Sequence, residues 1–73
     1  MNQLINLGWY NICDKLYETY YKTINNYTIC VAKHIDGNNW MVSIQTEEEI
    51  IEINKNASLK WVIKLADLLQ LGS

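Results

Sequence analysis

The sequence predicts a small α+β domain, a three-stranded antiparallel meander with two helices packed on one face. Three observations lead to this prediction. Apolar residues recur at spacings of three and four near each end of the chain, as in amphipathic helices. The middle is rich in aromatic and β-branched residues and is divided by turn-forming residues. The chain has 73 residues, so we expect one domain over residues 1–73 with the element order α-β-β-β-α.

The first helix is expected over residues 9–24. Asn11 and Asp14 resemble a capping arrangement at its start. Asn25 and Asn26 are a plausible stop, because asparagine tolerates the left-handed conformation that ends many helices. The apolar stripe of this predicted helix consists of Trp9, Ile12, Cys13, Leu16, Tyr20 and Ile24.

The middle of the chain predicts strands. Residues 27–34 are rich in aromatic and β-branched side chains, and residues 36–39, Asp-Gly-Asn-Asn, predict a turn. The next strand covers residues 40–45, with its apolar face on the even-numbered positions. Its inward residues are Trp40, Val42 and Ile44, and its outward residues are Met41, Ser43 and Gln45.

A third strand is expected over residues 49–53, with Ile51 and Ile53 inward and Ile50 and Glu52 outward. A helix over residues 46–54 is the competing interpretation, because glutamate-rich segments favour helix. We prefer the strand, since a lone hairpin is only marginally stable and a third strand supports it.

The last segment predicts a second helix. Its start is capped by Asn56 or Ser58, and Gly72 follows its end. Its apolar stripe consists of Leu59, Val62, Ile63, Ala66 and Leu69.

Composition narrows the class of protein. Hydrophobic residues make up 49% and the net charge is only −2, so we expect a folded chain rather than a disordered one. Two cysteines and no evident leader or long apolar run favour the cytoplasm of a microbial cell. Abundant Asn, Ile, Lys and Tyr without arginine or proline are typical of AT-rich genomes, such as a phage or mobile element of a low-GC host.

No catalytic, cofactor or metal site is expected. Cys30 and His34 would lie about 13 Å apart on one strand, too far to share a metal, and Cys13 is expected in the core with Cys30. The glycines are too scattered for a phosphate loop. The Glu47-Glu48-Glu49 run is either a solvated turn or an acidic patch that meets a basic partner.

The function expected from these observations is binding to another protein, without enzymatic activity. Two helices cover only one face of a sheet, so the other face remains for a partner, with self-association as a close variant. The residues expected at this surface are Met41, Ser43, Gln45, Ile50 and Glu52, bordered by Glu47, Glu48 and Glu49.

The order α-β-β-β-α resembles the double-stranded-RNA-binding domain. That resemblance implies nucleic-acid binding through lysines near the start of the last helix, here Lys55, Lys60 and Lys64, although the family's consecutive lysines and preceding glycines are missing. Six lysines, no arginine and a pI near 5.1 make nucleic acid the second choice.

The layout also resembles some small phage-encoded anti-CRISPR proteins, through its size, its acidic balance and the residues 36–38 before an aromatic strand. That resemblance implies an inhibitor that occupies a partner's surface.

Overall fold

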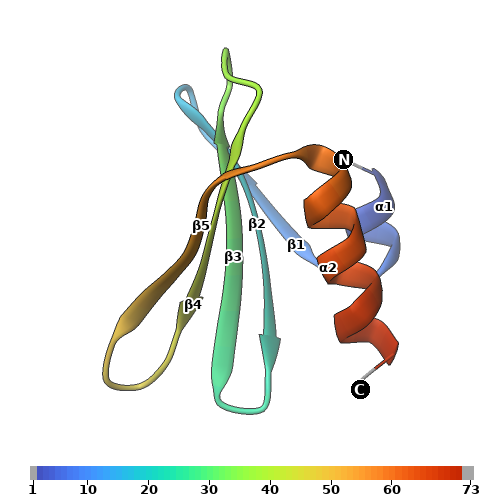
Figure 1. Ribbon diagram of the computed structural model, residues 1–73, viewed down its shortest axis with the longest axis vertical. Coiled ribbons are helices and arrows are strands. Elements are labelled where there is room, and N and C mark those ends of the chain that lie inside the picture. The colour runs from blue at the N-terminus through green and yellow to red at the C-terminus, as the bar shows by residue number, and fades with distance from the viewer. Residues whose placement is uncertain (1, 72–73) are drawn as a thin grey trace.

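The computed structural model describes residues 2–71, which form two helices and five strands (Figure 1). The strands make one antiparallel sheet in chain order, and both helices lie on the same side of it (Figure 1). The α+β class is confirmed, whereas the predicted number of strands is wrong, since the sheet has five and not three. Gly72, expected to stop the last helix, lies outside the described residues. The elements are α1 (Asn2–Asn6), β1 (Tyr10–Cys13), β2 (Tyr17–Ile24), β3 (Tyr27–His34), β4 (Trp40–Gln45), β5 (Ile50–Ala57) and α2 (Leu59–Leu71).

The helix predicted over residues 9–24 is wrong, because this segment forms β1 and β2. Leu16, Tyr20 and Ile24 are spaced by four, and four is a multiple of the strand period of two as well as close to one helical turn. The residues of β2 are mostly aromatic or β-branched, which favours a strand. Pairing with β3 along its whole length, from Tyr17 opposite His34 to Ile24 opposite Tyr27, then decides the matter.

The residues expected to begin and end that helix form hairpin turns instead. The Asp14 Oδ1 atom accepts hydrogen bonds from the backbone N–H groups of Tyr17 (2.7 Å) and Leu16 (2.8 Å), which reverses the chain between β1 and β2. These two bonds, that from Tyr17 first, lower the pKa of Asp14. Asn25 has a φ of 54° in the two-residue turn between β2 and β3.

The strands predicted over residues 27–34 and 40–45 are confirmed. Residues 46–54 are not helical, and β5 extends beyond the predicted strand to Ala57. Ile51 lies opposite Ile44 on the helix-facing side, as predicted. The register shifts between Glu52 and Asn54 and leaves Ile53 without a partner on β4, so its inward direction stays a prediction.

Local signals set the helix ends. Gly8, at a φ of 91°, ends α1 by donating its N–H to the Ile5 carbonyl, while Trp9 donates to the Leu4 carbonyl. Ser58 caps α2, because its Oγ accepts the N–H of Trp61 at 3.1 Å.

The core lies between the helices and the inner, helix-facing side of the sheet. It draws on α1, Trp9 directly before β1, the strands β2 to β5, and α2. Leu59 was predicted on the apolar stripe of the last helix, but its side chain is 45% exposed and does not belong to the core. The buried residues are Leu4, Trp9, Tyr20, Ile29, Val31, Trp40, Val42, Ala57, Val62 and Ala66.

Candidate protein-binding surfaces

The side of the sheet that faces away from the helices is called the outer face below. On β4, Trp40 and Val42 are buried while Met41 between them is exposed, so the odd-numbered side chains point to the outer face. Residues paired across neighbouring strands lie on the same face of the sheet. The register therefore shows which residues of the other strands lie on the outer face. The residues that the sequence placed on the outer face, and that lie there together, are Met41, Ser43, Gln45, Ile50 and Glu52. Further outer-face residues are Tyr10, Ile12, Tyr17, Thr19, Tyr21, Thr23, Thr28, Cys30, Ala32 and His34.

Along β1–β4, the outer face carries no lysine and no carboxylate. The charged residues of β2 and β3 occupy inner positions instead: Lys22 lies opposite Ile29, and Lys33 lies opposite both Glu18 and the buried Trp40. Exposed sheet faces usually carry the polar residues of a strand and packed faces the apolar ones. In this domain the charges of the central strands are therefore on the packed side. The open side of β1–β4 carries no lysine or carboxylate, and Glu52 on β5 adds a carboxylate at the edge of that side.

The outer face has several small side chains near its centre and aromatic side chains near its β1 edge. Cys30, Ala32 and Ser43 lie on neighbouring central strands, and their side chains are small. Near the β1 edge, the rings of Tyr10 and Tyr21 stack with their centres 5.4 Å apart. Small central side chains allow another surface to approach closely, and tyrosine is enriched in protein interfaces.

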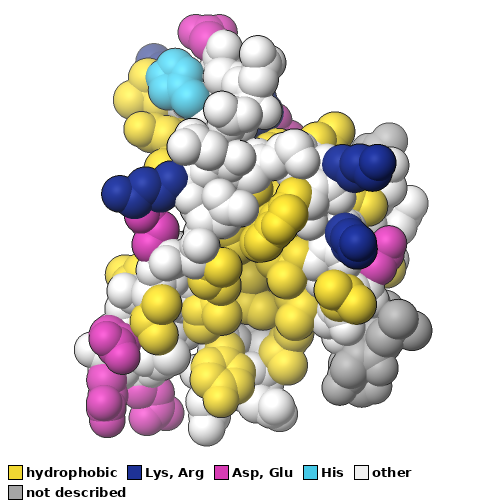
Figure 2. All heavy atoms as spheres, in the orientation of Figure 1, with side chains coloured by type: hydrophobic (Ala, Val, Ile, Leu, Met, Phe, Trp, Pro, Cys, Tyr) yellow, Lys and Arg dark blue, Asp and Glu magenta, His cyan; other side chains and the backbone are white. Residues whose placement is uncertain are grey.

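The Glu47-Glu48-Glu49 run lies in the turn between β4 and β5, in agreement with the predicted solvated turn. Whether it meets a basic partner stays a prediction. The Thr46 Oγ1 atom accepts the N–H groups of Glu48 (3.3 Å) and Glu49 (3.1 Å), which fixes the turn and leaves the carboxylates in solvent. Within residues 2–71, no lysine Nζ lies within 4.0 Å of these three carboxylates. The turn is thus an uncompensated acidic patch, and Figure 2 shows acidic side chains gathered there, at the lower left.

A groove of about 370 Å³ opens on the inner side of the sheet, beside the C-terminal part of α2. Figure 2 shows hydrophobic side chains gathered in the middle of this view, between the strands and α2. A helix is about 10 Å wide, whereas five strands span about 20 Å. With α1 only five residues long, the helices leave part of the inner face open. The groove was not predicted from the sequence, because two long helices were expected to cover this side of the sheet. Its lining residues are Ile24, Tyr27, Ile29, Ile44, Thr46, Ile51 and Leu69.

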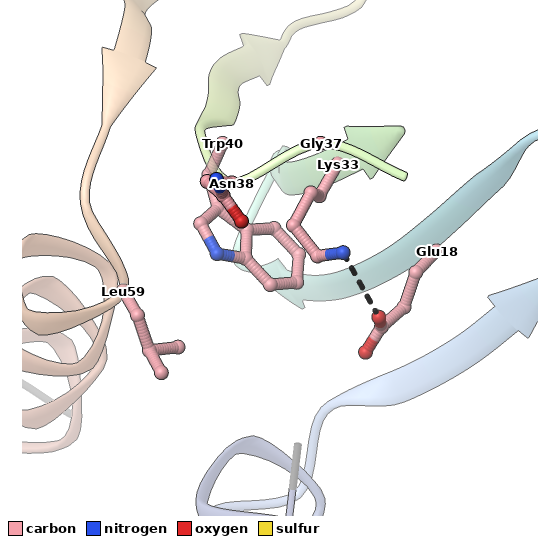
Figure 3. A pocket seen from close by; sticks show the side chains of 6 residues that line it. All are labelled: Glu18, Lys33, Gly37, Asn38, Trp40 and Leu59. Atoms are coloured by element: carbon pink, nitrogen blue, oxygen red, sulfur yellow. Dashed lines mark ion pairs between the residues drawn. The ribbon is translucent and has the colours of Figure 1, made fainter. Parts of the chain in front are cut away.

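A second hollow contains Glu18 and Lys33, two of the charged residues of the inner face (Figure 3). The Lys33 Nζ atom lies 3.8 Å from Glu18 Oε1 and 5.8 Å from the centre of the Trp40 ring. Glu18 also accepts a hydrogen bond of 2.6 Å from the Tyr20 hydroxyl. Burial, together with this bond, raises the pKa of Tyr20, so the phenol stays protonated and donates. These groups neutralise one another and hold Trp40 against the sheet. The hollow, of about 310 Å³, is lined by Glu18, Lys33, Gly37, Asn38, Trp40 and Leu59.

The two cysteines and the histidine lie in different surroundings. Cys13 is exposed, so its predicted place in the core is wrong, because it ends the edge strand β1 instead of lying on a helix. Cys30, also predicted in the core, is instead half-buried on the outer face, and burial raises the pKa of its thiol. His34 packs edge-on against Tyr17 and accepts the N–H of Asp36. Nowhere in the described chain do three His, Cys, Asp or Glu residues group closely enough to hold a metal ion.

The lysines predicted for nucleic-acid binding lie on two different elements, β5 and α2. Lys55 lies on β5, where its Nζ is 3.5 Å from a Glu52 carboxylate oxygen. Lys60 and Lys64 are exposed and one turn apart on α2. The element order that suggested the double-stranded-RNA-binding resemblance is also not the order observed, since five strands separate the helices.

Compared with protein-family models, curated proteins and solved structures, the chain matches none. Across residues 2–71, neither helix has the length and apolar character that crossing a bilayer requires. The function is therefore inferred from the surfaces of the domain itself.

Proposed function

We propose that this domain is a non-enzymatic protein-binding module whose binding surface is the outer face of its sheet. One observation carries the proposal: the charged residues of β2 and β3 point toward the helices, and the outer face of β1–β4 has none. Covering an ammonium or carboxylate group costs free energy unless a partner charge compensates it. The part of the outer face on β1–β4 has no such group, so another protein can cover it at little electrostatic cost, while Glu52 lies at the β5 edge.

The dimensions of this face indicate the strength of the complex. Five strands span about 20 Å, and strands of six to eight residues are about 20–27 Å long. Covering the face would remove about 500 Å² from each partner, or about 1,000 Å² in total, which is at the lower end for specific interfaces. We therefore expect a reversible complex, with the acidic turn at Glu47–Glu49 selecting a partner that is basic beside the contact.

The test is a charge placed in the middle of the outer face. Ala32→Glu puts a carboxylate between β2 and β4, while Ile5→Glu, at an exposed position of α1, makes the same kind of change away from the sheet. Wild type and both variants are used in quantitative affinity capture from the source cells. Each captured protein is then purified and titrated directly against the same three chains.

We expect a captured protein to bind wild type and Ile5→Glu with equal affinity and to be lost with Ala32→Glu. Circular dichroism spectra of the three chains check that the fold is retained. Equal binding by Ala32→Glu, or the failure of every captured protein to bind wild type in the titration, would show that the outer face is not the binding surface.

Two narrower expectations stay predictions. One is that the domain is an inhibitor from a phage or mobile element. This expectation is based on the composition and on the resemblance alone, and no described surface feature supports it specifically. Nucleic-acid binding through Lys55, Lys60 and Lys64 predicts a gel shift at low salt that Lys60→Glu with Lys64→Glu abolishes. Absence of a shift for wild type at low salt would reject it.

A further inference from the structure

The apolar groove and the acidic turn are one continuous surface on the helix side of the domain. Tyr27 and Thr46 line the groove, and they also line an adjoining hollow of about 280 Å³ together with Glu47 and Glu48. An apolar floor therefore leads directly to uncompensated carboxylates. The chemistry that fits such a surface is an amphipathic segment with aliphatic or aromatic anchors and a basic border.

The exposed side of α2 has this chemistry. Trp61, Leu65 and Leu68 recur at i, i+4 and i+7, so they lie on one side of the helix, where Leu65 is half-buried against the core. Trp61 is 37% exposed and Leu68 is 59% exposed. Lys64 lines a shallow hollow with these three residues, and Lys60 precedes it by one turn. In the part of the chain that the structure describes, neither lysine has a carboxylate oxygen within 4.0 Å.

The groove and the α2 stripe meet at Leu69. This residue lines the groove and follows Leu65 by four positions, so the stripe continues into the groove wall along the helix. Figure 2 shows the resulting surface, with hydrophobic side chains in the middle, basic side chains beside an acidic one over α2, and acidic side chains over the β4–β5 turn. The basic and acidic borders lie on opposite sides of the apolar centre.

We propose that a second copy of this chain covers this surface, so that α2 of each copy lies along the groove of the other. A two-fold dimer needs a surface that is complementary to itself, and this one pairs Trp61, Leu65 and Leu68 with the groove and Lys64 with Glu47 and Glu48. A cavity of 150 Å³ accommodates one benzene ring, so the groove of about 370 Å³ has room for about two large side chains of the partner's stripe.

This dimer goes beyond the proposed function, because it uses the opposite side of the sheet. Each outer face stays free, so the dimer would present two binding surfaces. A partner that engages both at once would be held more firmly than by either face alone.

The test is the mass of the full chain in solution, measured by sedimentation equilibrium over a wide range of concentrations. We expect twice the monomer mass of 8.6 kDa at high concentration. Leu68→Glu and Lys64→Glu should each weaken dimerisation at least about tenfold. Adding Glu47→Lys and Glu48→Lys to Lys64→Glu should restore it, because the charges are then exchanged across the interface.

Two matched controls separate this surface from the rest of the molecule. Ile12→Glu is a change at a position of similar exposure (56%) on the outer face, and Lys15→Glu reverses a charge in the β1–β2 turn; both should dimerise as wild type does. A monomer at every concentration, a dimer that survives Leu68→Glu, or a failure of the charge exchange would each overturn the proposal. Loss of the dimer in Ile12→Glu alone would assign self-association to the outer face instead. Partner capture by the same variants tests the proposed function independently.

Discussion

Replacing Val42 by threonine tests which face of β4 packs against the helices. Val42 is fully buried and lies opposite the equally buried Val31 on β3. Threonine keeps the shape of valine but places a hydroxyl among apolar side chains, at a cost of about 1–3 kcal/mol. A domain of this length has a total stability of about 4–10 kcal/mol. A loss of about 2 kcal/mol should therefore lower the Tm by roughly 8–16 °C.

The assay is thermal and urea unfolding followed by circular dichroism, with Met41→Thr as the matched control. Met41 is the neighbouring residue on the outer face, so its replacement should change the free energy of unfolding by less than about 0.5 kcal/mol. Equal losses for the two variants, or a larger loss for Met41→Thr, would refute the reasoning. Such a result would mean that the strand is displaced by one residue, which exchanges its two faces.

Three further predictions concern single side chains. Ser58→Ala removes the cap of α2, and we expect urea titration to show a free energy of unfolding about 1 kcal/mol lower. The hydrogen bonds that lower the pKa of Asp14 stabilise the fold above its ordinary pKa of about 3.9 and are lost as the pH falls through the lowered value. Urea midpoints of wild type and Asp14→Ala should thus differ at neutral pH and converge in strong acid; a constant difference would contradict this. Because Cys13 is exposed and burial raises the pKa of Cys30, thiol titration near neutral pH should show two phases, the faster one absent in Cys13→Ser.

The middle and the end of the chain could be predicted from local patterns. In β4, Trp40, Val42 and Ile44 alternate with Met41 and two polar residues, so one face was identifiable before any partner strand was known. In α2, Val62 and Ala66 are spaced by one turn and both are buried, while Ser58 marks the start. These signals are local, because each depends on neighbouring residues alone.

The beginning of the chain could not be predicted in this way. A spacing of four from Leu16 to Tyr20 to Ile24 satisfies a helix and a strand equally, so the pattern of apolar residues leaves both structures open. The deciding interaction is the ladder between β2 and β3, which joins residues up to 17 positions apart, as in Tyr17 opposite His34. The Asp14 side chain supported the wrong choice, because the same acceptor can cap a helix or close a turn.

The candidate surfaces, too, could be predicted from the sequence only where they depend on local patterns. The sequence predicted that one sheet face would be open and named its residues on β4 and β5, because strand alternation is a local property. It did not show that the open face is uncharged across β1–β4, since that follows from the pairing of the strands. The groove beside α2 likewise depends on the width of a five-stranded sheet relative to its helices.

The sequence by itself therefore determined the α+β class and the outward residues of β4, and it narrowed the cap of α2 to Asn56 or Ser58, because periodicity and capping act within a few residues. Only the tertiary structure decided that β1 and β2 form where a helix was expected and that a groove stays open beside α2. It also decided that the charged residues of β2 and β3 lie on the packed side. These features arise from contacts between distant segments, whose free energy outweighs the local preference of any one of them.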